Sequence, residues 1–271
     1  MKRLSELPAP ALAGVVREKS TLGAIAEIKN CACDGAAMID LHLSCLENTD
    51  VDSLKRIVNA SKLPILALNY NTNYEWQGLN LTEDERIDSF MRAVEAGVAG
   101  IDMQAYTYDL PSKTAFLGED KYSFTKNNPR EIVTDQAVID KQCALIEKVH
   151  SMGAEVLLSC HPGIQMKCEQ VVDLALFLEK RNADIIKIVT WAPTEEDMVE
   201  GIKTMLYLKR EVKTPVSYHV NGKYGALSRI INPMLGGQIA FCVDRYNEGS
   251  TMEQIDLRSA KKVLDGMQNI I

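Results

Sequence analysis

A lysine lies in the middle of a strongly apolar segment, residues 184–190, which reads DIIKIVT. Branched apolar residues without glycine or proline are typical of a strand that is buried on both faces of a parallel sheet. An ammonium group is costly in such surroundings, so a buried lysine tends to lose its proton, and a neutral amine forms Schiff bases with ketones. Two other interpretations of Lys187 stay open: an ion pair with a carboxylate, or exposure to solvent at the end of the strand.

Three of the four histidines end apolar segments of strand length: His42, His161 and His219. Enzymes built as α/β barrels place their chemistry at the carboxyl ends of the strands, so these imidazoles are expected at one rim. His161 ends the segment before the lysine strand, and we predict that it is the general acid and base of amine catalysis. The fourth, His150, lies in an expected helix and is predicted at the surface.

The same positions permit a second chemistry, a metal site. Imidazoles and carboxylates are the usual ligands of zinc and related ions. Such a site would use the three rim histidines together with Asp40 or Glu75. This interpretation leaves the buried lysine without a role. The preferred interpretation, a covalent imine through Lys187, needs no metal and no cofactor.

Apolar segments of strand length alternate with helical patterns along the chain. Strands are expected at residues 13–16, 37–43, 64–68, 100–104, 155–159, 184–190, 215–219 and 238–243. Helices are expected at residues 22–33, 51–60, 82–96, 135–152, 168–180, 195–210, 226–231 and 257–267. The third helix begins with a capping-box pattern at residues 82–85. Eight alternating units predict an α/β protein with a parallel sheet, and in 271 residues they favour a single (β/α)8 TIM barrel over residues 1–271.

The connection between the fourth strand and its helix, residues 105–134, is long and carries five aromatic residues. Loops of this length in a compact domain are usually functional or disordered, and the aromatic residues argue for order. Two interpretations are open, a lid over the mouth of the barrel and an inserted surface excursion.

The composition limits which other classes of protein and which cell compartments fit this chain. The net charge of −7 argues against a nucleic-acid partner. Seven cysteines, an odd number in a chain of this size, indicate reduced thiols and a cytoplasmic protein. No run approaches the roughly 20 apolar residues of a membrane span, and the first ten residues lack the core of a signal peptide.

Several segments together resemble one enzyme family. They are SCH at 159–161, ADIIKI at 183–188, GALSR at 225–229, GG at 236–237, AF at 240–241, and Ser250 with Gln254. Over nearly its whole length, and in the same order, the chain resembles type I 3-dehydroquinate dehydratases, the Schiff-base-forming (β/α)8 enzymes of the shikimate pathway.

The resemblance implies that Lys187 forms an imine with the C3 ketone of 3-dehydroquinate. His161 would remove a C2 proton to give an enamine and then protonate the departing C1 hydroxyl, and hydrolysis would release 3-dehydroshikimate. Arg229 would clamp the substrate carboxylate, while Ser250 and Gln254 would close over the substrate on a loop. The resemblance also implies a small-molecule keto acid as partner and a homodimer.

Departures from the family pattern lie mainly in the first half of the chain. The strand-two pattern Glu-x-Arg is replaced by DLH at 40–42, and residues 68–78 contain no arginine. On the fourth strand Gln104 replaces a glutamate, and on the seventh His219 and Asn221 replace methionines. The remaining candidate substrate contacts are therefore Asp40, His42, Glu75 and His219.

Loss of two arginine forks matters because charge-assisted hydrogen bonds contribute about 1.5–3 kcal/mol each. Either lysines or Arg130 from the long connection supply the charge, or the substrate is a different keto acid. We predict a lyase that forms a Schiff base and dehydrates 3-dehydroquinate. The alternatives are a related imine-forming lyase or class I aldolase, a metal-dependent barrel isomerase or hydrolase, and a catalytically silent barrel that binds a ligand or partner.

Overall fold

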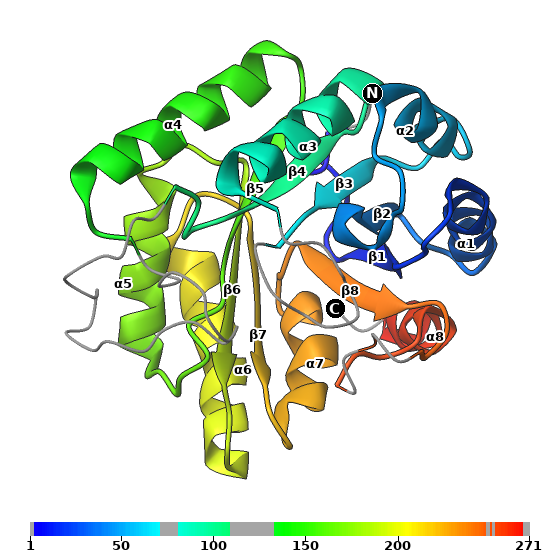
Figure 1. Cartoon of the computed structure of the whole chain (residues 1–271). Coiled ribbons are helices and arrows are strands. Elements are labelled where there is room, and N and C mark those ends of the chain that lie inside the picture. The colour runs from blue at the N-terminus through cyan, green and yellow to red at the C-terminus, as the bar shows by residue number, and fades with distance from the viewer. Residues whose placement is uncertain (1–2, 71–80, 109–132, 248–249, 251–252, 268–271) are drawn as a thin grey trace.

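Strands and helices alternate along the chain, and the helices lie outside the strands (Figure 1). The computed structural model describes residues 3–70, 81–108, 133–247, 250 and 253–267. The strands are β1 (Ala11–Val16), β2 (Met38–His42), β3 (Ile65–Leu68), β4 (Gly100–Gln104), β5 (Glu155–Cys160), β6 (Ile185–Trp191), β7 (Val216–Asn221) and β8 (Ile239–Val243). The helices are α1 (Thr21–Cys33), α2 (Val51–Val58), α3 (Glu83–Ala96), α4 (Gln136–Ser151), α5 (Cys168–Glu179), α6 (Glu195–Glu211), α7 (Ser228–Met234) and α8 (Leu257–Met267), with short 3₁₀ turns η1 (Leu43–Cys45) and η2 (Gly225–Leu227).

Neighbouring strands are parallel, in the order β7-β6-β5-β4-β3-β2-β1-β8. The two strands at the ends of that order meet. The N–H of Gln238 donates to the carbonyl of Val216 at 2.9 Å, and the N–H of Ile239 donates to the hydroxyl of Ser217 at 2.9 Å. The sheet is therefore a nearly closed ring, and the predicted (β/α)8 TIM barrel is confirmed.

The predicted boundaries differ from the observed ones by a few residues. β1 begins at Ala11, two residues before the prediction, and β7 continues to Asn221, two residues beyond it. The helix expected at 226–231 is the turn η2 followed by α7, which ends at Met234. The predicted capping box of α3 is present between Thr82 and Glu85. Residues 109–132 of the long connection lie outside the described ranges, and so does the expectation of a lid.

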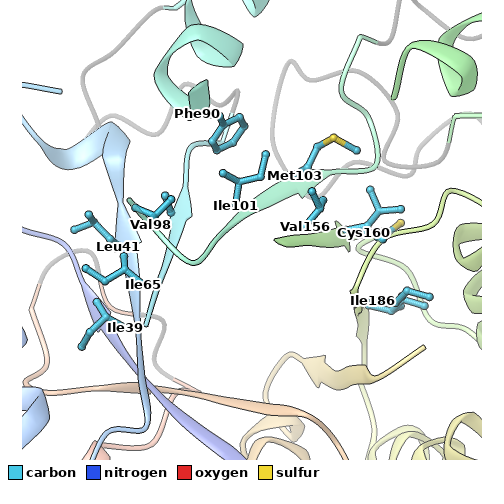
Figure 2. Close-up of a cluster of buried hydrophobic side chains, with 14 of the residues drawn as sticks. Ile39, Leu41, Ile65, Phe90, Val98, Ile101, Met103, Val156, Cys160 and Ile186 are labelled. Atoms are coloured by element: carbon cyan, nitrogen blue, oxygen red, sulfur yellow. The ribbon is translucent and has the colours of Figure 1, made fainter. Parts of the chain in front are cut away.

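Side chains along each strand point alternately inward and outward, because successive residues of a strand face opposite sides of the sheet. The outward set packs beneath the helices in one cluster, which includes Phe90 of α3 and residues from β2 to β6 (Figure 2). The inward set fills the barrel with Ala11, Ala13, Val15, Met38, Leu66, Leu157, Ile185, Ile239 and Phe241.

The inward series becomes polar toward the carboxyl ends of the strands. On five strands, the inward-facing residues that follow the apolar ones are buried polar side chains, which lie on the strand or just beyond its end. They are Asp40, His42, Asp102, Gln104, Ser159, His161, Lys187, Ser217 and His219. The alternation therefore gathers the chemically active residues at one end of the barrel.

The N-terminal segment closes the other end. Leu4 and Leu7 join the apolar interior, and the amide of Gln238 donates to their carbonyls at 3.3 and 3.0 Å. The N–H groups of Leu4 and Ser5 donate to the carboxylate of Glu155. This leaves the polar end as the side from which a ligand can reach the interior. Across the described ranges, no helix has both the length and the apolar character needed to cross a membrane.

Candidate active site

Lys187 lies on β6 with its side chain almost wholly buried. Its Nζ lies 3.4 Å from Oδ2 of Asp102 and 4.3 Å from the centre of the Phe241 ring. A carboxylate and an aromatic face both stabilise an ammonium group. The contact with a carboxylate, one of the open interpretations of this lysine, is therefore present, and the amine can act as a nucleophile only in its neutral form.

His161 follows β5 and is buried against Tyr70. Nε2 of His161 lies 3.1 Å from the hydroxyl of Tyr70, and the two rings meet edge to face at 5.4 Å between centroids. Burial, together with the positive charges of Lys187 and Arg229, lowers the pKa of His161 well below its usual range. The imidazole is therefore neutral near pH 7 and can accept a proton.

The sequence analysis missed Tyr70 as a site residue. Its hydroxyl accepts a hydrogen bond from Nζ of Lys187 at 3.4 Å as well as contacting His161. The residue lies two positions beyond Leu68, the last residue of β3, so it continues the inward series of that strand. That alternation is the signal in the sequence that could have found it.

Asp102 on β4 is held by a buried chain of hydrogen bonds. The amide nitrogen of Gln104 donates to Oδ1 of Asp102 at 3.3 Å, and its amide oxygen accepts from Arg86 at 2.5 Å. Arg86 in turn forms two bonds with the carboxylate of Glu83, at 2.7 and 2.8 Å. Burial raises the pKa of Asp102, and the charge of Lys187 opposes that rise. The network fixes the position of the carboxyl group that faces Lys187.

His42 and Asp40 lie on β2, with His42 Nε2 3.6 Å from Asp40 Oδ2. Burial, reinforced by the charge of Arg17, lowers the pKa of His42 to about 4. His219 on β7 is buried near Arg229 and Lys187, and its pKa is lowered well below the usual range mainly by burial. These imidazoles are neutral near pH 7.

His150 lies on α4, as predicted, and 30% of its side chain is exposed. Its Nε2 lies 2.8 Å from Oδ2 of Asp184, a contact that the prediction did not include. Asp184 also accepts from the N–H of Val156 at 2.8 Å and pairs with Arg3 at 3.0 Å. The carboxylate needs these partners because it is nearly buried at the foot of the barrel, and the sequence pattern of α4 carries no sign of them.

Arg229 is the second residue of α7, and its guanidinium is buried. Its Nη2 donates to Oδ1 of Asn221 at 2.6 Å, and burial lowers its pKa to about 10. The hydroxyl of Ser228 accepts from the N–H of Val220 at 3.0 Å and donates to the carbonyl of Gly225 at 2.7 Å. Ser228 therefore holds the start of α7 against β7, and Asn221 directs the arginine beside it.

Arg17 is a second cation near the mouth that the sequence analysis did not select. It follows β1 directly and continues the inward series Ala13, Val15. Electrostatic attraction to Asp40 and Tyr70 partly offsets the burial that lowers its pKa. Its field contributes to the low pKa of both His42 and Arg229. Arg17 therefore places a positive charge beside β2, the strand on which this chain lacks the arginine of the family pattern.

The loop after β8 is described only in part. The hydroxyl of Ser250 donates to Asn247 at 3.1 Å and accepts from its N–H at 2.9 Å. Gln254 is buried, and its backbone carbonyl accepts a hydrogen bond from the hydroxyl of Tyr246 at 2.5 Å. Both loop residues thus lie in local hydrogen bonds after β8. Glu75 lies outside the described ranges.

A cavity of about 280 Å³ opens beside these groups, and it is lined by His161, Gly163, Val189, Thr190, Trp191 and Asn221. Its volume is near that of a small-molecule site. Val189 lies two residues beyond Lys187 on the inward side of β6, so the lysine lies deeper in the barrel than the cavity wall.

The histidines are not gathered as metal ligands. In the part of the chain that the structure describes, no three histidine, cysteine, aspartate or glutamate side chains form a group that could hold a metal ion. The set of His42, His161 and His219 with Asp40 is therefore not assembled.

The fold and the site together define a (β/α)8 barrel enzyme whose polar mouth combines a lysine, a neutral histidine and a buried arginine. Residues 14–271 match the family model described as type I 3-dehydroquinase, and the chain belongs to that family. The predicted family is thereby confirmed. Family membership supports a hydro-lyase and does not favour the metal-dependent alternative.

Individual relatives agree with this assignment. A catabolic 3-dehydroquinate dehydratase of Acinetobacter baylyi is 27% identical over 139 residues, which cover 51% of this chain and 49% of the relative, about half the length of each. A 3-dehydroquinate dehydratase of Aromatoleum aromaticum is 20% identical over 229 residues, covering 80% of this chain and 75% of the relative.

Solved structures of similar fold carry the same description. The 3-dehydroquinate dehydratase of Geobacillus kaustophilus superposes with a TM-score of 0.76 at 15% identity, covering 99% of this chain and 96% of that one. The type I enzyme of Clostridium difficile gives a TM-score of 0.73 at 16% identity, covering 97% and 94%. At these identities the likeness establishes the fold.

Proposed function

We propose that the protein dehydrates 3-dehydroquinate to 3-dehydroshikimate through an imine on Lys187. The observation that carries this proposal is the shared position of the amine and the imidazole. One hydroxyl, that of Tyr70, lies within 3.4 Å of Nζ of Lys187 and within 3.1 Å of Nε2 of His161. A ketone carbon bound to the amine therefore has its neighbouring carbon within reach of a neutral base.

The imine supplies the chemistry that the barrel residues then direct. Once the C3 carbonyl has become a protonated imine, it is an electron sink, so the C2 proton becomes acidic enough for the imidazole of His161 to remove. The electron pair of that C–H bond forms an enamine. His161 then gives a proton to the C1 hydroxyl, which leaves as water, and hydrolysis of the imine frees the amine of Lys187. The reaction needs no cofactor beyond the covalent imine.

Two arginines, Arg229 buried and Arg17 partly buried, are proposed to recognise the acid. Arg229, oriented by Asn221, offers a planar fork to the carboxylate of a keto-acid substrate. Arg17 adds a second positive charge from β1 and takes the place of the charge that β2 and β3 lack. The pair lowers the cost of burying an anion in a mouth that already holds Asp40 and Asp102.

The remaining assignments are proposals of the same kind. Ser250 and Gln254 would close over the substrate, and Asp40, His42, Glu75 and His219 would contact its hydroxyl groups. A homodimer and a cytoplasmic location are expected from the family resemblance and the cysteine content.

Borohydride trapping tests this function. The protein is incubated with 3-dehydroquinate, reduced, and digested for mass spectrometry, alongside Lys187→Ala and the matched variant Lys203→Ala, which removes a half-exposed lysine from α6. We expect a reduced adduct on the peptide with Lys187, retained in Lys203→Ala and absent in Lys187→Ala, and 3-dehydroshikimate absorbance with the unreduced protein.

Two other outcomes would count against the proposal. Adducts with other keto acids but none with 3-dehydroquinate would assign the same imine chemistry to a different substrate, the related lyase or aldolase. No adduct with any ketone would remove the Schiff-base mechanism.

A further inference from the structure

Three polar groups form a continuous hydrogen-bonded path across the mouth of the barrel. Nζ of Lys187 donates to the hydroxyl of Tyr70 at 3.4 Å, and that hydroxyl contacts Nε2 of His161 at 3.1 Å. The first group carries protons as an ammonium, and the last is a neutral imidazole that can accept one. A hydroxyl between such a donor and acceptor can pass a proton, because it both donates and accepts.

We propose that Tyr70 is a catalytic residue that relays protons from the nitrogen of Lys187 to His161 while the imine forms. The inference rests on the proposed imine chemistry and adds the residue that makes the amine reactive. It answers a problem set by Asp102, whose carboxylate stabilises the ammonium form of a lysine that must attack as the neutral amine.

The protons balance as follows. One proton passes from the ammonium of Lys187 through Tyr70 to His161, and the neutral amine then attacks the ketone to form a C–N bond and an alkoxide. His161 protonates the alkoxide. A second proton then leaves the nitrogen by the same path, and His161 delivers it to the hydroxyl as the C–O bond breaks. Water departs, one proton stays on the iminium nitrogen, and Tyr70 ends unchanged.

The geometry around Tyr70 suits this role better than that of a packing residue. Its ring meets the imidazole edge to face, at 80° between planes, and its hydroxyl contacts both the lysine and the imidazole nitrogen. Both end groups are almost wholly buried, so bulk water has little access to them as a competing proton carrier. Burial also holds His161 in its neutral form, which keeps the acceptor ready.

The test measures the rate at which borohydride-trappable imine accumulates in wild type, Tyr70→Phe and Tyr207→Phe. Tyr70→Phe keeps the ring against His161 and removes only the hydroxyl. Tyr207→Phe makes the same change on the exposed surface of α6. We expect imine formation to slow by roughly 10²-fold in Tyr70→Phe, in line with the contribution of general acid–base groups, and to be unchanged in Tyr207→Phe.

A second variant separates proton transfer from structural support. Replacing Tyr70 by 3-fluorotyrosine keeps ring and hydroxyl but makes the phenol more acidic. A relay must hold its proton in order to donate to His161, so the fall in rate at high pH should move to lower pH. A packing role would leave the pH profile in place. This variant also decides the question if Tyr70→Phe does not fold.

Simple keto acids are assayed beside 3-dehydroquinate so that the relay and the proposed function fail separately. A wild-type rate in Tyr70→Phe, or an unshifted profile in the fluorotyrosine variant, overturns the relay and leaves the imine on Lys187 standing. A slowed rate seen only with another ketone supports the relay and changes the substrate. If wild type forms no adduct with any ketone, both proposals fall.

Discussion

Nζ of Lys187 lies 3.4 Å from Oδ2 of Asp102, although the two residues belong to strands that are not neighbours in the sheet. β5 lies between β4 and β6, and the two side chains meet because both point into the barrel. The pair reconciles a buried lysine with a stable fold, since each charge compensates the other. Its consequence for catalysis is that the carboxylate opposes loss of the proton that the amine must lose.

Replacement of this carboxylate should change the rate of imine formation. In Asp102→Asn the nitrogen of Lys187 loses the charged partner 3.4 Å away that favours its ammonium form, so we expect imine trapping at pH 7 to be roughly tenfold faster than in wild type. The control Asp265→Asn removes a half-exposed carboxylate from α8 and should leave the rate unchanged. Equal rates for wild type and Asp102→Asn would show that this carboxylate does not govern the amine.

The buried arginine behind the site should be important for stability. Arg86 is almost wholly buried and bonds Glu83, Gln104 and the hydroxyl of Thr107. In Arg86→Met the carboxylate of Glu83 and the amide of Gln104 lose their partner, and breaking such a pair typically costs about 3–5 kcal/mol. We expect about 3 kcal/mol less free energy of unfolding in urea, because Glu83 keeps some contact with water.

Arg92→Met provides the matched comparison on the same helix. Arg92 is partly buried and donates to the carbonyl of Thr49 at 3.0 Å, so its loss should cost about 1 kcal/mol. Equal destabilisation of the two variants would mean that the hydrogen-bond network behind Asp102 contributes no more to the free energy of unfolding than the contact of Arg92 does.

The second cation at the mouth should act on substrate binding. Arg17→Met removes one charge-assisted contact of about 1.5–3 kcal/mol, which corresponds to roughly a 10–150-fold rise in KM. We expect kcat to change little, because the contact is the same in the ground state and the transition state. Steady-state kinetics with 3-dehydroquinate measure both constants. Arg258→Met, at an exposed arginine of α8, should leave them unchanged, and so should Arg17→Met if Arg17 never meets the substrate.

The barrel could be predicted from the sequence because each strand is a short apolar run between helical patterns. β4 was predicted with its observed bounds, Gly100–Gln104, since Gly97 and Gly100 limit it on one side and polar residues follow on the other. Lys187 and His161 could be predicted as site residues from their places at the ends of such runs. β7 continues to Asn221, two residues beyond its predicted end, and Gly222, with a φ of 106°, turns the chain directly after it.

Contacts across the barrel could not be predicted. The pairing of Lys187 with Asp102 depends on the stagger between β4, β5 and β6, which places Ser159 opposite Lys187 and Leu157 opposite Asp102. Tyr70 could not be predicted for a different reason. The family pattern places arginines, not a tyrosine, in the segment after β3, and only the alternation along β3 indicates that Tyr70 points inward just beyond the strand.

Acid should unfold the protein through its buried histidines, and His42 allows the effect to be measured. The pKa of His42 in the fold is about 4, against about 6.5 in an unfolded chain. Between these values the unfolded chain binds a proton that the folded state does not. The free energy of unfolding therefore falls as pH drops from about 6.5 to 4, by up to about 3 kcal/mol from this residue.

His42→Gln should reduce that fall, because glutamine does not titrate. Urea unfolding of wild type and variant at several pH values between 7 and 4.5 gives the two slopes. We expect the variant to be less stable than wild type at pH 7 and to lose less stability on acidification, with His161 and His219 providing the remaining slope, since burial lowers the pKa of both. Parallel slopes in the two proteins would contradict the assignment of a neutral, buried imidazole at position 42.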